Sequence, residues 1–137
     1  MDWQSLAYAI VQVAHNFGAA ALVGSAFSAL WLADRQPEIR YKLAWVMLLG
    51  WAVQAASGAG FGAVSFLYYG ELPDIHGIAI AALVIKIACA AGGFLLAAVY
   101  LRAAARWAEP ARTRAWRVQA VLSATALTAA AFLRWFS

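Results

Sequence analysis

Four long apolar runs, separated by short polar segments, constrain this chain more than any other feature. The runs cover residues 6–33, 43–69, 75–101 and 116–136. A helix needs about 20 mostly apolar residues to cross the hydrocarbon core of a bilayer, and each run is long enough. All three prolines and nearly all the charged residues lie between the runs, where helices are expected to end. The sequence therefore predicts an all-α integral membrane protein, a bundle of four transmembrane helices forming one domain over residues 1–137.

The scarcity of charge supports this class of protein. Charged residues make up 12% of the chain, whereas a soluble domain carries roughly 25%. A surface with so few charges is expected to face lipid. The net charge is +4, but the basic residues lie beside the apolar runs, where they contact lipid headgroups and set topology. We therefore expect the lipid bilayer as a partner and no binding to nucleic acid.

The distribution of basic residues predicts the orientation of the bundle. The first and third connections between runs contain lysine and arginine, whereas the second contains only acidic charges, Glu71 and Asp74. Connections rich in basic residues stay on the cytoplasmic side of a membrane. The first and third connections are therefore predicted to be cytoplasmic, and both termini are predicted to lie outside.

Polar residues in the spans are the candidates for a functional site, because they are costly in lipid. Gln12, His15 and Asn16 follow an i, i+3, i+4 spacing and so share one face of a helix. His76 is predicted to open the third helix. Counting helix rise from the cytoplasmic arginines places both histidines near the outer boundary. They are predicted either to share a copper ion or a haem iron, or to hydrogen-bond across helices and to interfacial water.

Lys86 is the most costly residue of the spans to place in lipid. It lies 16 residues before Arg102, well inside the bilayer, where a charged side chain costs about 2.5–3.5 kcal/mol. No acidic residue is expected at the same depth. Lys86 is therefore predicted to be neutral, to bond to carbonyl groups or Gln54, or to bind an anionic group. A haem propionate, a quinone oxygen and a partner's carboxylate are the candidate groups, and partial snorkelling to the outer face is the structural alternative.

Gly58 and Gly62 lie four residues apart in the second run and share a helix face. Small residues at this spacing let helices pack closely in lipid. The same face offers room for a flat cofactor such as a haem, and both interpretations stay open.

Two stretches of the chain resemble a known family. Residues 13–24 contain a histidine followed by small residues and a closing glycine, and residues 77–88 contain a glycine, an apolar run and then Lys86. Over about the first hundred residues the chain resembles the copper resistance protein D family of bacterial inner-membrane proteins. The resemblance implies a helical bundle related to b-type cytochromes, a multi-pass location in the bacterial inner (cytoplasmic) membrane, and copper handling. It carries His15 and Lys86 over as motif positions.

Three functions are consistent with these features. The first is copper handling, or metal or haem binding, at the outer face. The second is a subunit of an electron-transfer complex that binds haem b or a quinone, and the third is a non-catalytic accessory subunit docked on other membrane subunits, without a cofactor. Motifs of soluble enzymes are absent, so we expect at most an electron-transfer subunit. The predicted metal ligands are His15 and His76, and the predicted cofactor-binding residues are Gln12, Asn16, Lys86, Gly58 and Gly62.

Overall fold

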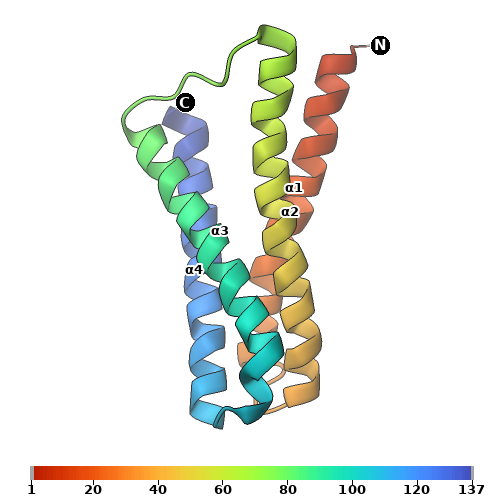
Figure 1. The fold of residues 1–137 in the computed structure, drawn as a ribbon, viewed down its shortest axis with the longest axis vertical. Coiled ribbons are helices and arrows are strands. Elements are labelled where there is room, and N and C mark those ends of the chain that lie inside the picture. The colour runs from red at the N-terminus through yellow and green to blue at the C-terminus, as the bar shows by residue number, and fades with distance from the viewer. Residues whose placement is uncertain (1, 137) are drawn as a thin grey trace.

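The computed structural model describes residues 2–136, which are helical apart from short connections (Figure 1). The elements are α1 (Trp3–Trp31), α2 (Pro37–Tyr69), α3 (Ile78–Ala103), a 3-10 turn η1 (Ala104–Arg106) and α4 (Glu109–Phe136). Each of the four α-helices is long and apolar enough to cross a membrane. The predicted all-α class, a bundle of four membrane-spanning helices, is confirmed.

All four helices begin at positions other than those predicted from the apolar runs, and α1 begins at Trp3 rather than residue 6. α2 and α4 begin at Pro37 and Glu109, well before residues 43 and 116. Proline suits the first helical position and glutamate suits the first turn, so both helices continue past the apolar run into charged sequence. α3 begins later than residue 75, at Ile78, because Gly77 before it has a φ of 52° and is not helical. The prediction that His76 opens this helix was wrong.

The helices form two hairpins, α1 with α2 and α3 with α4, which pack side by side. The connections within the hairpins, 32–36 and 104–108, lie together at what we call the loop end. The two chain termini and the α2–α3 connection lie at the opposite end, the termini end (Figure 1). The hairpins are close at the loop end and separate toward the termini end, where α3 tilts away from α2.

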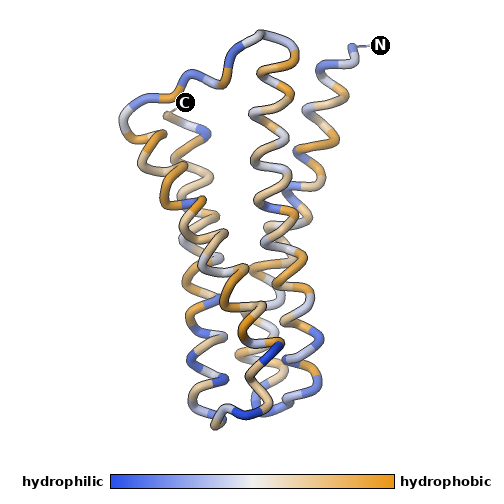
Figure 2. The backbone as a smooth tube through the Cα atoms, in the orientation of Figure 1, coloured by the Kyte–Doolittle hydropathy of each residue, from blue (hydrophilic) through white to orange (hydrophobic). Residues whose placement is uncertain are grey.

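Hydrophilic residues concentrate at the two ends of the bundle and are sparse between them (Figure 2). Both basic connections lie at the loop end, and the connection that carries Glu71 and Asp74 lies at the termini end. The two segments predicted to share the cytoplasmic side therefore do share one end of the molecule.

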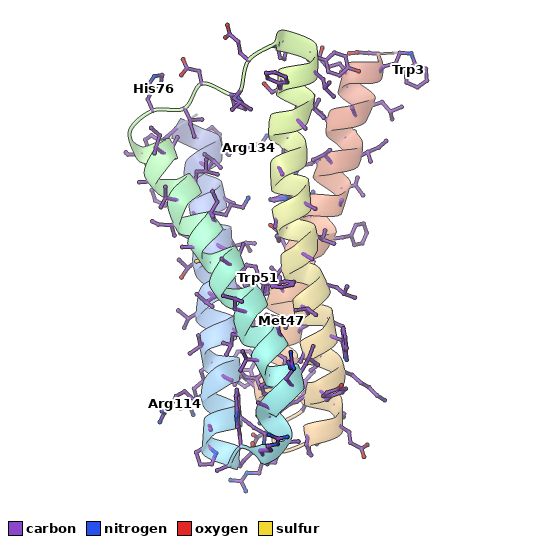
Figure 3. All side chains as sticks on the ribbon, in the orientation of Figure 1. Trp3, Met47, Trp51, His76, Arg114 and Arg134 are labelled. Atoms are coloured by element: carbon purple, nitrogen blue, oxygen red, sulfur yellow. The ribbon has the colours of Figure 1, made fainter. Side chains whose placement is uncertain are left out.

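The loop-end half contains the best-packed part of the core. Trp51 of α2 and Met47 one turn away are almost completely buried in the middle of the bundle (Figure 3). The Trp51 indole occupies the space beside Gly93 of α3, where a Cβ atom would overlap it. Its Nε1 donates to Oε1 of Gln119 at 3.0 Å, and Nε2 of Gln119 donates to the Gly93 carbonyl at 2.9 Å. These two hydrogen bonds link buried groups of α2, α3 and α4.

A buried arginine joins the helices at the loop end. Arg40 of α2 is 1% exposed and donates Nε to the Ala29 carbonyl of α1 at 3.1 Å. Its terminal nitrogens donate to Asp34 at 3.2 Å, to Glu109 at 2.6 Å and to Thr113 at 3.2 Å. The arginine fork thus satisfies acceptors from α1, the first connection and α4 at once.

Asp2 begins α1 at the termini end. Its carboxylate accepts from the backbone nitrogens of Gln4 and Ser5, as a helix cap does. The hydrogen bond from the Ser5 hydroxyl lowers the pKa of the Asp2 carboxyl from its usual value. The cap is therefore charged at neutral pH, next to the positive end of the helix dipole.

Candidate functional site

Three helices contribute to one hydrogen-bonded polar centre, which consists of His15 of α1, Ser57 of α2 and Lys86 of α3. Nδ1 of His15 lies 2.6 Å from Oγ of Ser57, and Nε2 of His15 lies 2.8 Å from Nζ of Lys86. Ser57 is buried, and the other two side chains are half-buried. α1 and α3 are diagonal partners that pack against other helices rather than each other, so the Lys86–His15 bond crosses the bundle.

The hydrogen bonds of Ser57 fix the tautomer of His15. The Ser57 hydroxyl has one hydrogen, which it donates to the Val53 carbonyl at 2.6 Å. It must then accept from His15, so Nδ1 carries the hydrogen and Nε2 carries the lone pair. Lys86 donates to that lone pair. The result is a directed chain from Lys86 through a neutral imidazole and a hydroxyl to a backbone carbonyl.

The polar centre lies inside the membrane-spanning part of the bundle. His15 is 12 residues into α1 and Lys86 is 8 residues into α3, which corresponds to about 18 Å and 12 Å of helix. Lys86 also lies about two turns from Gly93, toward the termini end, and no residue of α1 before Gly18 is buried. The polar centre is therefore where the two hairpins begin to separate.

The structure does not bring the two histidines together. His76 lies on the α2–α3 connection with its side chain 81% exposed, and its Nε2 is 3.3 Å from Asp74 (Figure 3). His15 instead lies inside the bundle with both ring nitrogens bonded. The predicted depth of His76 assumed a helix that included it, but α3 begins at Ile78. The predicted His15–His76 pair is not formed.

Gln54 of α2, which the sequence offered as a partner for Lys86, bonds to α1 instead. Its Nε2 donates to the His15 carbonyl at 2.5 Å. Gly18 permits this close approach, because a Cβ atom there would lie 2.9 Å from the same nitrogen. Gln54 therefore holds α1 and α2 together just beside the polar centre.

Gly58 and Gly62 do not form a tight contact with another helix of this chain. A Cβ atom at Gly58 would meet nothing within 4 Å, and one at Gly62 would meet only Leu72, at 3.8 Å. Between them, the Phe61 ring packs edge-on against His15 with ring centres 5.6 Å apart. The aromatic ring thus gives the polar centre one apolar wall.

Gln12 and Asn16 lie next to His15 on α1. Nε2 of Gln12 donates to Oδ1 of Asn16 at 2.7 Å, as their i, i+4 spacing allows. Asn16 is exposed and Gln12 is half-buried. The two amides flank the polar centre, and in residues 2–136 they are bonded only to each other.

Ser57 and Phe61 were not recognised from the sequence. Ser57 lies in the glycine-rich stretch around Gly58 and Gly62, for which close helix packing and room for a flat cofactor were both predicted. Its spacing from Gln54, three residues, places two polar groups on one face of α2. That face matches the polar face of α1, and this signal pointed to Ser57.

Comparisons with models of protein families, with curated proteins and with solved structures found no match to this chain. Function is therefore inferred from the chemistry of the polar centre. Within residues 2–136, no three His, Cys, Asp or Glu side chains gather closely enough to hold a metal ion.

Proposed function

We propose that this protein is a non-catalytic subunit of an electron-transfer complex in the bacterial inner membrane, and that its polar centre binds a quinone. The observation that carries the proposal is the hydrogen bond between Lys86 and His15 inside the membrane-spanning bundle. In residues 2–136, no carboxylate lies within ion-pairing distance of Lys86. In that part of the chain, its Nζ is bonded only to the His15 imidazole.

The chemistry of Lys86 indicates what the ligand must supply. A lysine ammonium has three donors, and one of them is used by His15. The hydrocarbon core offers no acceptors for the other two. A quinone carries carbonyl oxygens that accept such bonds, and its tail is soluble in the bilayer.

His15 complements the reduced form of the same ligand. When Lys86 turns from Nε2 to donate to a quinol oxygen, the freed Nε2 lone pair can accept the quinol's hydroxyl hydrogen. Ser57 holds the imidazole in the required orientation, and Phe61 offers an aromatic wall for a flat ring. This chain binds and orients the carrier, and the other subunits of the complex exchange electrons with it.

The residues present fit copper and haem less well. Copper sites need several imidazole or sulfur donors, and a bis-histidine haem b needs two imidazoles. His15 supplies only one imidazole nitrogen beside Lys86, and His76 lies on the exposed connection. Met47 is buried in the loop-end core, so it does not add a sulfur ligand beside His15.

Nitrogen NMR on the protein in lipid nanodiscs tests this proposal. With 15N-labelled histidine, we expect His15 to show the Nδ1–H tautomer, and decylubiquinone to shift its Nε2 resonance. Lys86→Met should weaken quinone binding about tenfold to a hundredfold, since a hydrogen bond to a charged group contributes about 1.5–3 kcal/mol. Lys86→Arg should retain much of the affinity.

His76→Ala is the matched control, because it removes the other histidine and should leave quinone binding unchanged. Equal quinone affinity in wild type and Lys86→Met would overturn the proposal. So would cuprous-ion binding that depends on His15 while decylubiquinone leaves the His15 resonances unmoved, because that result would favour copper handling.

A further inference from the structure

The amide pair of α1, Gln12 and Asn16, has unused hydrogen-bonding capacity inside the membrane-spanning region. Nε2 of Gln12 donates to Oδ1 of Asn16, and in residues 2–136 neither amide bonds to another residue. Asn16 is exposed. Polar side chains at this depth normally find a partner, because lipid tails cannot hydrogen-bond. Something other than this chain is expected to cover the pair.

The unused atoms of the pair are complementary to themselves. The internal bond leaves Oε1 of Gln12 as an acceptor and Nδ2 of Asn16 as a donor. A twofold axis would let each Asn16 donate to Gln12 of a second copy. If both amides were flipped, one acceptor and one donor would still remain, so the complementarity does not depend on their assignment.

A second copy of this chain would also present its amide pair at the matching depth in the bilayer. Two copies with the same orientation place their amide pairs at the same level of the bilayer. Two residues beside the pair on this side of α1 are small, Ala9 three positions before Gln12 and Ala20 four after Asn16, and the exposed Val13 lies between them. Both alanines are exposed, so another helix can approach closely.

We propose that the protein forms a twofold dimer in which α1 of one copy packs on α1 of the other, with the Gln12 and Asn16 amides bonding reciprocally across the axis. The interface is isologous, since the same surface is used by both copies. It is separate from quinone binding, so either can hold without the other.

Energy transfer between labelled copies in liposomes, measured over a range of protein-to-lipid ratios, tests the dimer. We expect wild type to dimerise. The double variant Gln12→Leu/Asn16→Leu should raise the dissociation constant about tenfold or more, since it removes the hydrogen bonds between helices. The matched control is Thr125→Val/Thr128→Val, which removes exposed polar groups of α4 and should change nothing.

Disulfide cross-linking locates the interface. In a Cys89→Ser background, Ala9→Cys should cross-link two copies, whereas Leu127→Cys on the exposed face of α4 should not. Helical circular dichroism of each variant confirms that it is folded. The proposal is overturned if folded wild type stays monomeric at every ratio, if the double leucine variant dimerises like wild type, or if another protein occupies this face of α1.

Discussion

The loop-end and termini-end halves of the bundle each hold a basic side chain away from water, and the two side chains differ in their hydrogen-bond partners. Arg40 at the loop end bonds to a carbonyl, a hydroxyl and two carboxylates. Lys86 in the termini-end half bonds to one neutral imidazole. A planar guanidinium with five donors suits a fixed network, whereas an ammonium on a flexible stem can exchange partners. Arg40 therefore has its donors satisfied by this chain, whereas Lys86 has a single protein partner within residues 2–136.

Packing follows the same division. The loop-end half closes around Trp51, whose indole fits beside Gly93 and bonds to Gln119. In the termini-end half the hairpins separate, and α1 has no buried residue before Gly18. Stability is therefore expected to be concentrated in the loop-end half.

Removal of Arg40 should produce the largest loss. Arg40→Met leaves Asp34 and the Ala29 carbonyl without their donor, and it removes the closest cation from Glu109. Water can replace Arg40 at the Asp34 and Glu109 side chains, which are 59% and 34% exposed, but the hydrogen bonds of the buried guanidinium, each worth about 1.5–3 kcal/mol, are lost. A loss of about 3 kcal/mol in the free energy of unfolding is expected. Reversible denaturation by sodium dodecyl sulfate, followed by tryptophan fluorescence, measures it.

Arg114→Met is the control for Arg40→Met. Arg114 lies on α4 near the same end, and its side chain points away from the bundle (Figure 3). Its removal should change the free energy of unfolding by less than about 0.5 kcal/mol, as surface substitutions do. Equal effects of the two substitutions would contradict a structural role for Arg40.

Two adjacent glycines give the next comparison. Gly93→Ala places a Cβ atom inside the Trp51 indole and should cost about 1–3 kcal/mol by overpacking. Gly92→Ala meets nothing closer than Leu122 at 3.9 Å and should be neutral or slightly stabilising, because alanine favours helix. The difference between the two unfolding free energies isolates the contact. Similar values for both variants would show that Trp51 is free to move aside.

The fold was predictable because each helix that crosses a bilayer needs about 20 mostly apolar residues. Four apolar runs gave four helices, and the alternation of basic and acidic connections predicted that both basic connections share an end. The helix starts were less predictable from hydropathy alone. α2 and α4 begin in charged sequence, where Pro37 and Glu109 provide local start signals that hydropathy ignores.

The sequence singled out two residues of the polar centre, but it did not predict that they contact each other. His15 and Lys86 each stood out as costly groups in a span, yet counting from two different arginines placed them about 6 Å apart in depth. The long side chain of Lys86 covers that difference by crossing to the diagonal helix, and a single sequence does not encode which helices lie diagonally. His76 was misplaced because the start of α3 was misplaced.

Replacement of Lys86 should have the smallest effect on stability, and with the opposite sign. An ammonium in the membrane costs about 2.5–3.5 kcal/mol, whereas the imidazole acceptor left unpaired by Lys86→Met costs about 1–3 kcal/mol. From the middle of each range, the variant is expected to be more stable than wild type by about 1 kcal/mol. Lys42→Met, at an exposed position of α2, controls for the loss of a charge. A loss as large as that of Arg40→Met would make Lys86 a structural residue and remove the difference between the two halves.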